Sequence, residues 1–364
     1  MARWARRCLL AAARQDRYRF AMLTAALIAF VIWAAMLLVW HGFWRADQRL
    51  PPSTPDDASD RPGVVAVIPA RNEAASIGAV VEAPSGKGAG DENFPVGSFL
   101  IAKKHRPAVM AYYAFARGTD DIADDAALAP QEKIRRLDAC EDGLLPGASG
   151  APEMSARLGA VLRENGVEMS CATDLLIAFR QDALKARYAD WDDLIGYCAN
   201  SARPVGRFLL QLHGESPSTA PASDALCDAL QVLNHLQDIA VDKTRLDRVY
   251  LPQDWLEAEG VDEGSLTAPS ASPGLRRVID RCLEGCARLL DTSRPLADQT
   301  RSRRMAAEIA VIQRLAERLH ARLGREDPLA GRVKHSRLDL LAGLGAGLWR
   351  LLTHRPAGAG PERA

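Results

Sequence analysis

The sequence has no surplus of either charge: 46 Lys and Arg residues balance 46 Asp and Glu residues in a chain of 364. Proteins that bind nucleic acid usually carry a basic surplus, so we expect no nucleic-acid partner. The seven cysteines include no C-x-x-C pair, and such an odd, scattered set is typical of a reducing cytosol. No G-x-G-x-x-G run occurs, so the chain lacks the usual dinucleotide-binding loop.

Aromatic residues make up only 6% of the chain, and runs of β-branched residues are few. Ala and Leu are abundant instead, and both favour helices. Several segments repeat apolar residues every three or four positions, which is the spacing of one helix face: 133–140, 156–163, 172–188, 275–290 and 304–323. A domain of about 260 residues is long enough for one large core. The sequence therefore predicts an all-α fold.

Two acidic motifs stand in apolar surroundings. Asp120 and Asp124 end one apolar segment, and Asp238 and Asp242 end another. An acidic run is often only the solvated face of a helix. Carboxylates four residues apart lie on the same helix face, however, and burying them is costly without a compensating cation. Such oxygen ligands suit Mg²⁺, which takes further ligands from substrate phosphates. The two motifs thus predict a site for a metal-bound diphosphate.

Four segments together resemble the squalene/phytoene synthase family, in its hopanoid-pathway branch. They are Glu92–Phe99, Tyr113–Asp124, Tyr197–Arg207 and Asn234–Asp242, the last followed by Asp247–Pro252. Their order and spacing match the family over residues 84–345. Gln237 stands where many relatives have Arg. The resemblance implies an isoprenoid synthase type of helical bundle.

The resemblance also implies roles for particular side chains. It implies Mg²⁺ ligands at Asp120, Asp124, Asn234, Asp238 and Asp242. It implies diphosphate contacts at Arg117, Arg248 and Ser98. Tyr113, Tyr197 and Tyr250 would line the cavity in which a carbocation develops, where ring faces attract positive charge. Ordinary core packing is the alternative explanation for these tyrosines.

The implied activity is Mg²⁺-dependent ionisation of presqualene diphosphate, with water ending the reaction as hydroxysqualene. Two alternatives are condensation of two farnesyl diphosphates to presqualene diphosphate or squalene, and phytoene synthesis. The implied partners are a prenyl diphosphate substrate, a membrane and other enzymes of the hopanoid pathway. An inert, membrane-anchored interaction protein is a further alternative, but it would be expected to lack the aspartates, and all of them are present.

The first 83 residues have a different character. Residues 1–19 are basic, and residues 20–40 form an uncharged run long enough to span a bilayer as a helix. Residues 41–83 combine a linker with a short β/α fragment, in which Val64–Ala74 resembles the start of a family 2 glycosyltransferase of the hopanoid-associated type. The fragment is too short for sugar transfer. The expected order is therefore anchor, fragment, synthase domain 84–345 and polar tail 346–364.

The charges around the predicted span give conflicting signals about topology. Six arginines precede it and two follow it, so the positive-inside rule places the synthase outside the cytoplasm. Prenyl diphosphates are cytosolic, and initiation at Met22 would remove the six arginines and reverse the orientation. We expect the synthase at the cytoplasmic face of the inner membrane. The stretch 338–352 is interrupted by Asp339 and Arg350 and is at most interfacial.

Overall fold

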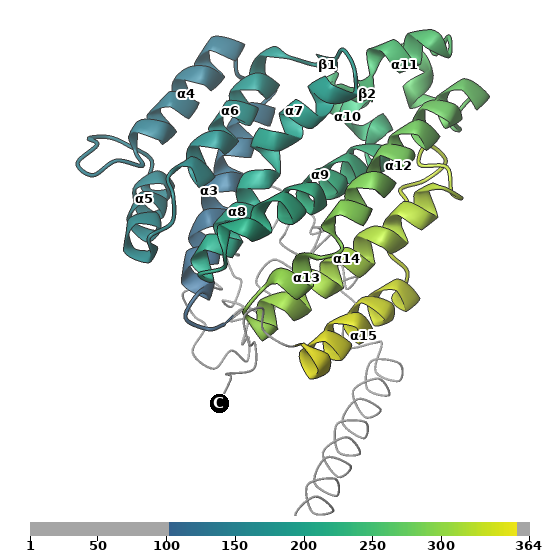
Figure 1. Ribbon diagram of the computed structural model, residues 1–364. Helices are drawn as coiled ribbons and strands as arrows, with labels where there is room; N and C mark the ends of the chain where they lie inside the picture. The colour runs from purple at the N-terminus through teal and green to yellow at the C-terminus, as the bar shows by residue number, and fades with distance from the viewer. Residues whose placement is uncertain (1–101, 355–364) are drawn as a thin grey trace, which may run out of the picture. The chain divides into compact units, whose positions relative to one another are not determined.

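The computed structural model describes residues 102–354, which belong to the larger of two units of the chain, Glu82–Ala364. These residues form a helical bundle (Figure 1) of α3 Arg106–Asp124, α4 Pro130–Asp142, α5 Glu153–Asn165, α6 Ser170–Leu184, α7 Trp191–Ser201, α8 Arg203–Leu212, α9 Ala220–Gln237, α10 Ile239–Leu246, α11 Gln253–Ala258, α12 Pro273–Ser293, α13 Leu296–Gln299, α14 Arg303–Leu323 and α15 Arg337–Thr353. Short 3₁₀ turns at Pro217–Thr219 and Glu263–Thr267 join some of them. The all-α prediction is confirmed for this part of the chain.

The predicted N-terminal features lie outside the described residues. These features are the basic segment 1–19, the transmembrane helix 20–40, the fragment 41–83 and Ser98. Between residues 102 and 354, no helix is both long enough and apolar enough to cross a membrane. The transmembrane helix and the domain boundaries therefore stay predictions.

Polar side chains fix where several helices begin. The hydroxyl of Ser272 accepts from the Leu275 amide at the start of α12, and Ser302 does the same for Met305 in α14. Ser336 and Asp339 form a reciprocal capping box at the start of α15. A capping side chain satisfies an amide that the helix itself leaves unpaired, and each cap contributes about 1 kcal/mol. These caps therefore help to set the first residues of α12, α14 and α15.

Two apolar cores support the bundle. One is built mainly from α3, α4, α5 and α6, and includes Phe115 and Leu176. The other surrounds α9 and α12, and includes Leu233 and Ile279. Helix α8 contributes Phe208 to the first core and Leu210 to the second. The two cores therefore meet along α8, next to the helices that carry the acidic motifs.

A pair of very short parallel strands positions the segment after the second motif. Strand β1 is Arg187–Tyr188 and strand β2 is Val249–Pro252, with Arg187 opposite Val249. The Val249 amide donates to the carbonyl of Ala186 at 2.9 Å. This pairing fixes the backbone next to Arg248 against the chain that leaves α6. Residues more than sixty positions apart in sequence are thereby brought together.

Candidate active site

The first acidic motif ends α3 and is held by an arginine of the same helix. Arg117 contacts the carboxylate of Asp120 at 3.2 Å and that of Asp121 at 2.6 Å. The spacing of three and four residues makes both contacts possible within one turn. Arg117 as a diphosphate contact stays a prediction, but its guanidinium does lie beside the motif. Asp124, on the same face as Asp120, is left for a partner from elsewhere.

That partner is Arg248, which connects distant parts of the chain. Its guanidinium contacts the Asp124 carboxylate at 2.7 Å and lies 3.9 Å from the carboxylate of Asp182 on α6. It also donates to the Asp182 backbone carbonyl at 3.0 Å. The Arg248 side chain is buried, and buried charge of this kind requires paired partners. Arg248 therefore joins the end of the first motif to the strand that follows the second.

Asp120, Asp124 and Asp182 form what we call the acidic cluster. Burial, followed by the charge of Asp124, raises the pKa of Asp120 to about 7. Burial also raises the pKa of Asp182 to about 6, despite the opposing effect of Arg248. One Asp182 oxygen has no hydrogen-bond partner among the described residues. The cluster thus holds more negative charge than the arginines around it neutralise.

The second acidic motif straddles a break between two helices. Helix α9 ends at Gln237, and Asp238 leaves helical geometry with φ −109° and ψ 14° before α10 starts at Ile239. A bidentate ion pair with Arg332, at 2.9 and 3.0 Å, holds the Asp238 carboxylate. The buried amide of Gln237 donates to the Val333 carbonyl at 2.5 Å. The chain before α15 therefore covers this break.

Asn234 and Asp242 lie on either side of the break. Asn234 is in the last turn of α9, and its backbone carbonyl accepts from the Asp238 amide at 3.1 Å. Asp242 lies in α10, and it lines a small cavity of about 10 Å³ together with Arg248 and Tyr250. The Arg248 amide also donates to the Asp242 backbone carbonyl at 3.2 Å, so Arg248 contacts the last residue of each motif. It is the residue through which the two motifs are brought together.

Aromatic rings pack next to the acidic cluster. Tyr197 donates to Asp182 at 2.9 Å, and its ring centre lies 5.6 Å from that of Tyr250. The Tyr188 ring stacks on the Tyr250 ring with their centres 5.4 Å apart. The His235 ring also stacks on Tyr250, with a centre-to-centre distance of 3.5 Å. Burial keeps the pKa of both Tyr197 and Tyr250 well above 10, so their phenols stay neutral. Burial lowers the pKa of His235 to about 3, so the imidazole is also neutral.

An apolar cavity of about 140 Å³ lies between α8, α9 and α14. Its walls include Val205, Leu209, Leu226, Leu230 and Ile309. Ser201 and Gln231 also line it, and they lie one turn from Tyr197 and Asn234 on the same helices. A cavity of about 150 Å³ holds benzene, so this one fits about one isoprene unit. One part of its wall therefore lies a helical turn away from Tyr197 and Asn234.

Gly206 keeps this region compact. A Cβ atom at this position would lie 2.6 Å from the Ser223 hydroxyl and 2.7 Å from the Cys227 sulfur. Those two side chains belong to α9 and line the same cavity. Only glycine lets α8 approach α9 so closely without displacing them. The wall of the cavity therefore depends on this residue.

The structure brings several of the predicted site residues together, and their roles stay predictions. Arg117, Asp120, Asp124, Asp182 and Arg248 are in one connected set of charges. Tyr197 and Tyr250 are in ring contact, whereas Tyr113 lies partly buried on α3, one turn before Arg117. Sequence reasoning missed Asp182, Arg332, Tyr188 and His235. Of these, Asp182 had a detectable signal, since it follows the buried Leu175 and Phe179 on one face of α6.

The donor set fits Mg²⁺ without forming a complete cage. Between residues 102 and 354, no three or more His, Cys, Asp or Glu side chains are grouped closely enough to hold a metal ion by themselves. Mg²⁺ usually binds one or two carboxylates and takes its other ligands from water and phosphate. The excess negative charge at Asp120 and Asp182 provides the electrostatic reason for a cation. The residues are thus suited to a metal that arrives with a diphosphate.

An all-α bundle that holds paired arginines and carboxylates beside packed aromatic rings, and that has an apolar cavity between its helices, defines an isoprenoid synthase type of protein. The family model for squalene/phytoene synthase matches residues 88–339. The chain therefore belongs to the squalene/phytoene synthase family. The family prediction is confirmed.

Curated relatives and solved structures agree with this assignment. The hydroxysqualene synthase of Rhodopseudomonas palustris is 42% identical over 280 residues, which cover 77% of this chain and 96% of the relative. That of Zymomonas mobilis is 42% identical over 71% of this chain and 87% of the relative. The crystal structure of squalene synthase HpnC from Alicyclobacillus acidocaldarius is 32% identical with a TM-score of 0.56, covering 62% of this chain and 85% of that one. A dehydrosqualene synthase, 21% identical with a TM-score of 0.59 over 70% of this chain and 90% of that one, shares the fold.

Proposed function

We propose that the protein converts presqualene diphosphate to hydroxysqualene. The observation that carries the proposal is the position of Arg248, between the carboxylates of Asp124 and Asp182 and next to Tyr250. A diphosphate bound near this guanidinium would leave its hydrocarbon part facing the aromatic rings and the apolar cavity. The identity to two hydroxysqualene synthases, over 87% or more of each, supports the choice of product.

Arginines of this chain would bind the departing diphosphate. Arg117 and Arg248 hold the first motif, and Arg332 holds Asp238 of the second. Guanidinium groups bind phosphate oxygens as well as carboxylates, with similar bidentate geometry. They can therefore pass from carboxylate to diphosphate without leaving the site. Their positive charge would then lie where negative charge develops as the ester ionises.

We also propose that Asp120, Asp124, Asn234, Asp238 and Asp242 hold Mg²⁺. When bound, the metal would supply positive charge that neutralises the leaving diphosphate. The acidic cluster supports this role because its carboxylates repel one another as they stand. Ser98 stays a predicted diphosphate contact outside the described residues.

Neutral aromatic groups would stabilise the cation that remains. The rings of Tyr188, Tyr197 and Tyr250 pack together beside Asp182. Ring faces attract a cation, and phenols that stay protonated do not trap it as strong nucleophiles. The apolar walls exclude bulk water until the carbon skeleton has rearranged. A single admitted water would then add to the cation, lose a proton and leave an alcohol.

Product analysis in ¹⁸O-labelled water tests the proposal. With presqualene diphosphate and Mg²⁺, we expect hydroxysqualene that carries the label in its hydroxyl group. Formation of squalene that depends on NADPH, or efficient conversion of farnesyl diphosphate alone, would favour the condensing alternative. Phytoene formed from geranylgeranyl diphosphate would favour phytoene synthesis instead. The Asp120→Asn variant serves as the inactive control.

The place of action is a proposal of the same kind. We infer a location at the cytoplasmic face of the inner membrane, because the substrate is a cytosolic prenyl diphosphate and residues 20–40 are long enough to span a bilayer. Other hopanoid-pathway enzymes remain proposed partners. Protease protection of the synthase domain in spheroplasts and in inverted vesicles would show which side it occupies.

A further inference from the structure

Helix α15 carries its large apolar side chains on the outside. Six of them are between 40% and 71% exposed: Leu338, Leu340, Leu344, Leu348, Trp349 and Leu352. Its inner face is made of small residues, since Gly343 and Gly347 are buried against α14. A Cβ atom on Gly347 would lie 2.6 Å from Val311. The helix is thus packed closely on the bundle by these glycines and by the partly buried Leu351, while most of its large apolar side chains point away from it.

This pattern is the reverse of an ordinary surface helix, which buries its large apolar residues and exposes charged ones. The only acidic residue of α15, Asp339, is buried and contacts Arg318 at 2.6 Å. The exposed residues of α15 include one charge, Arg337 in its first turn. We call the outward side of α15 the leucine face. Contiguous apolar surface of this kind marks an interaction site.

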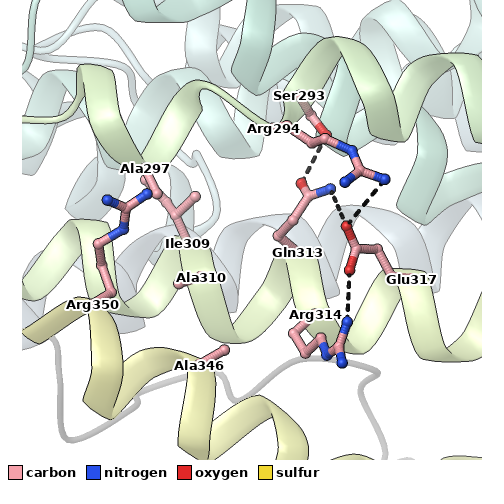
Figure 2. A pocket seen from close by; sticks show the side chains of 10 residues that line it. All are labelled: Ser293, Arg294, Ala297, Ile309, Ala310, Gln313, Arg314, Glu317, Ala346 and Arg350. Carbon is pink, nitrogen blue, oxygen red and sulfur yellow. Dashed lines mark hydrogen bonds and ion pairs between the residues drawn. The ribbon is translucent and has the colours of Figure 1, made fainter.

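Basic side chains surround the leucine face. A cavity of about 170 Å³ is lined by residues of α12, α13, α14 and α15, and Figure 2 shows Arg294, Arg314, Arg350 and Glu317 around it. Arg314 contacts Glu317 at 3.3 Å, and Arg294 lies 3.8 Å from it. Arg350, which α15 contributes, is bound to Asp298 at 2.5 Å. Arg294 also contacts Asp291 at 2.9 Å, so three guanidinium groups lie near one edge of the face together with the carboxylates that pair with them.

The two ends of the leucine face are basic as well. Lys334 and Arg337 are exposed at its beginning. At its far end, Gly347 lies beside the Ala307 carbonyl of α14, and the exposed Arg303 and Arg304 come one turn before that residue. Basic groups around an apolar, tryptophan-containing helix suit an anionic lipid surface. A second copy of the chain is a less suitable partner for the leucine face, because a two-fold contact would place these arginines against one another.

We propose that α15 docks on the surface of a membrane that contains anionic phospholipid. Its leucine face would enter the boundary between headgroups and acyl chains, and the surrounding arginines would contact lipid phosphates. The docking is independent of residues 20–40 and does not depend on which reaction the enzyme catalyses. It would hold the bundle against the phase into which a hydrocarbon product dissolves.

Quenching of Trp349 fluorescence by brominated lipids tests this directly. The full chain is mixed with vesicles of phosphatidylcholine and phosphatidylglycerol with bromine on the acyl chains. The chain has seven tryptophans, so the emission of Trp349 is obtained as the difference between the wild type and Trp349→Phe. We expect bromine to reduce this difference by about half or more, since interfacial helices lie about 5–10 Å deep.

Two variants distinguish insertion of the leucine face from nonspecific binding to the vesicles. Leu344→Gln combined with Leu348→Gln should restore most of the Trp349 emission. Leu145→Gln, at an exposed leucine in the turn after α4, should not. Omitting phosphatidylglycerol should weaken quenching several-fold. If bromine leaves the Trp349 emission unchanged, the proposal is overturned. The leucine face would then be covered by something other than a membrane, such as residues 1–101 or a second copy of the chain.

Discussion

Replacing Asp120 by Asn should make the protein more stable and catalytically inactive. Burial and the charge of Asp124 raise the pKa of Asp120 from 3.8 to about 7. Taken alone, such a shift corresponds to about 4 kcal/mol of penalty on the charged form at high pH. The Asp120 side chain is 36% exposed, so solvent screening reduces the penalty to about 1–2 kcal/mol. Asparagine keeps the shape and removes the charge.

The measurement is thermal unfolding by circular dichroism at pH 8 in EDTA. We expect the midpoint of Asp120→Asn to rise by about 2–6 °C over the wild type, given the usual scaling for a domain of this size. The matched control is Asp121→Asn. Asp121 is 41% exposed and paired with Arg117 at 2.6 Å, so its replacement should leave the midpoint unchanged or slightly lower. Turnover of Asp120→Asn should fall by orders of magnitude.

Addition of Mg²⁺ with pyrophosphate should reverse the order of stability. A ligand that binds only the folded state stabilises it by an amount that grows with the logarithm of the ratio of ligand concentration to dissociation constant. The wild type should therefore gain stability, and Asp120→Asn should gain much less. A variant that unfolds at a lower temperature than the wild type in EDTA would refute the electrostatic reasoning. Equal gains with Mg²⁺ and pyrophosphate would refute the metal assignment.

Three further predictions concern other parts of the chain. Arg248→Lys should lower turnover by about 100-fold or more while circular dichroism stays unchanged, because a point charge cannot contact both Asp124 and Asp182. Gly285→Ala should lower the free energy of unfolding in urea by about 1–3 kcal/mol, since the new Cβ would lie 2.4 Å from the Trp191 ring. As a control, Gly196→Ala should not lower it in this way, because no atom lies within 4 Å of a Cβ at that position. A chain that starts at Pro84 should keep its turnover on detergent-dispersed substrate, and a loss would show that residues 1–83 pack on the synthase.

The first motif could be predicted from sequence because its geometry is local. Arg117, Asp120 and Asp124 belong to one helix, where spacing alone fixes which side chains meet. The apolar repeats that predicted α12 and α14 are local in the same way. The motifs were sufficient to predict the family, and through the family they predicted where in the chain the site residues lie. These parts needed no knowledge of how helices pack.

The rest of the site depends on tertiary contacts that no spacing encodes. Arg332 reaches Asp238 from 94 positions away, and Arg248 reaches Asp124 from 124 positions away. The break at Asp238 was also unforeseen, because residues 222–246 contain neither Pro nor Gly to signal it. Asp182 could have been found as a charged residue on an otherwise buried helix face. Its costly burial was the signal, as burial was for the acidic motifs themselves.

The same acidic cluster determines how stability should vary with pH. A carboxyl whose pKa is higher in the folded state binds more protons when folded, so stability rises as pH falls through that value. For Asp120 the penalty is complete above about pH 7 and disappears below its ordinary value of 3.8; for Asp182 the corresponding upper limit is about pH 6. Urea unfolding in EDTA should therefore show the advantage of Asp120→Asn over the wild type shrinking steadily between pH 8 and pH 5. An advantage that is the same at every pH would mean that Asp120 is not held as a strained carboxylate in the folded protein.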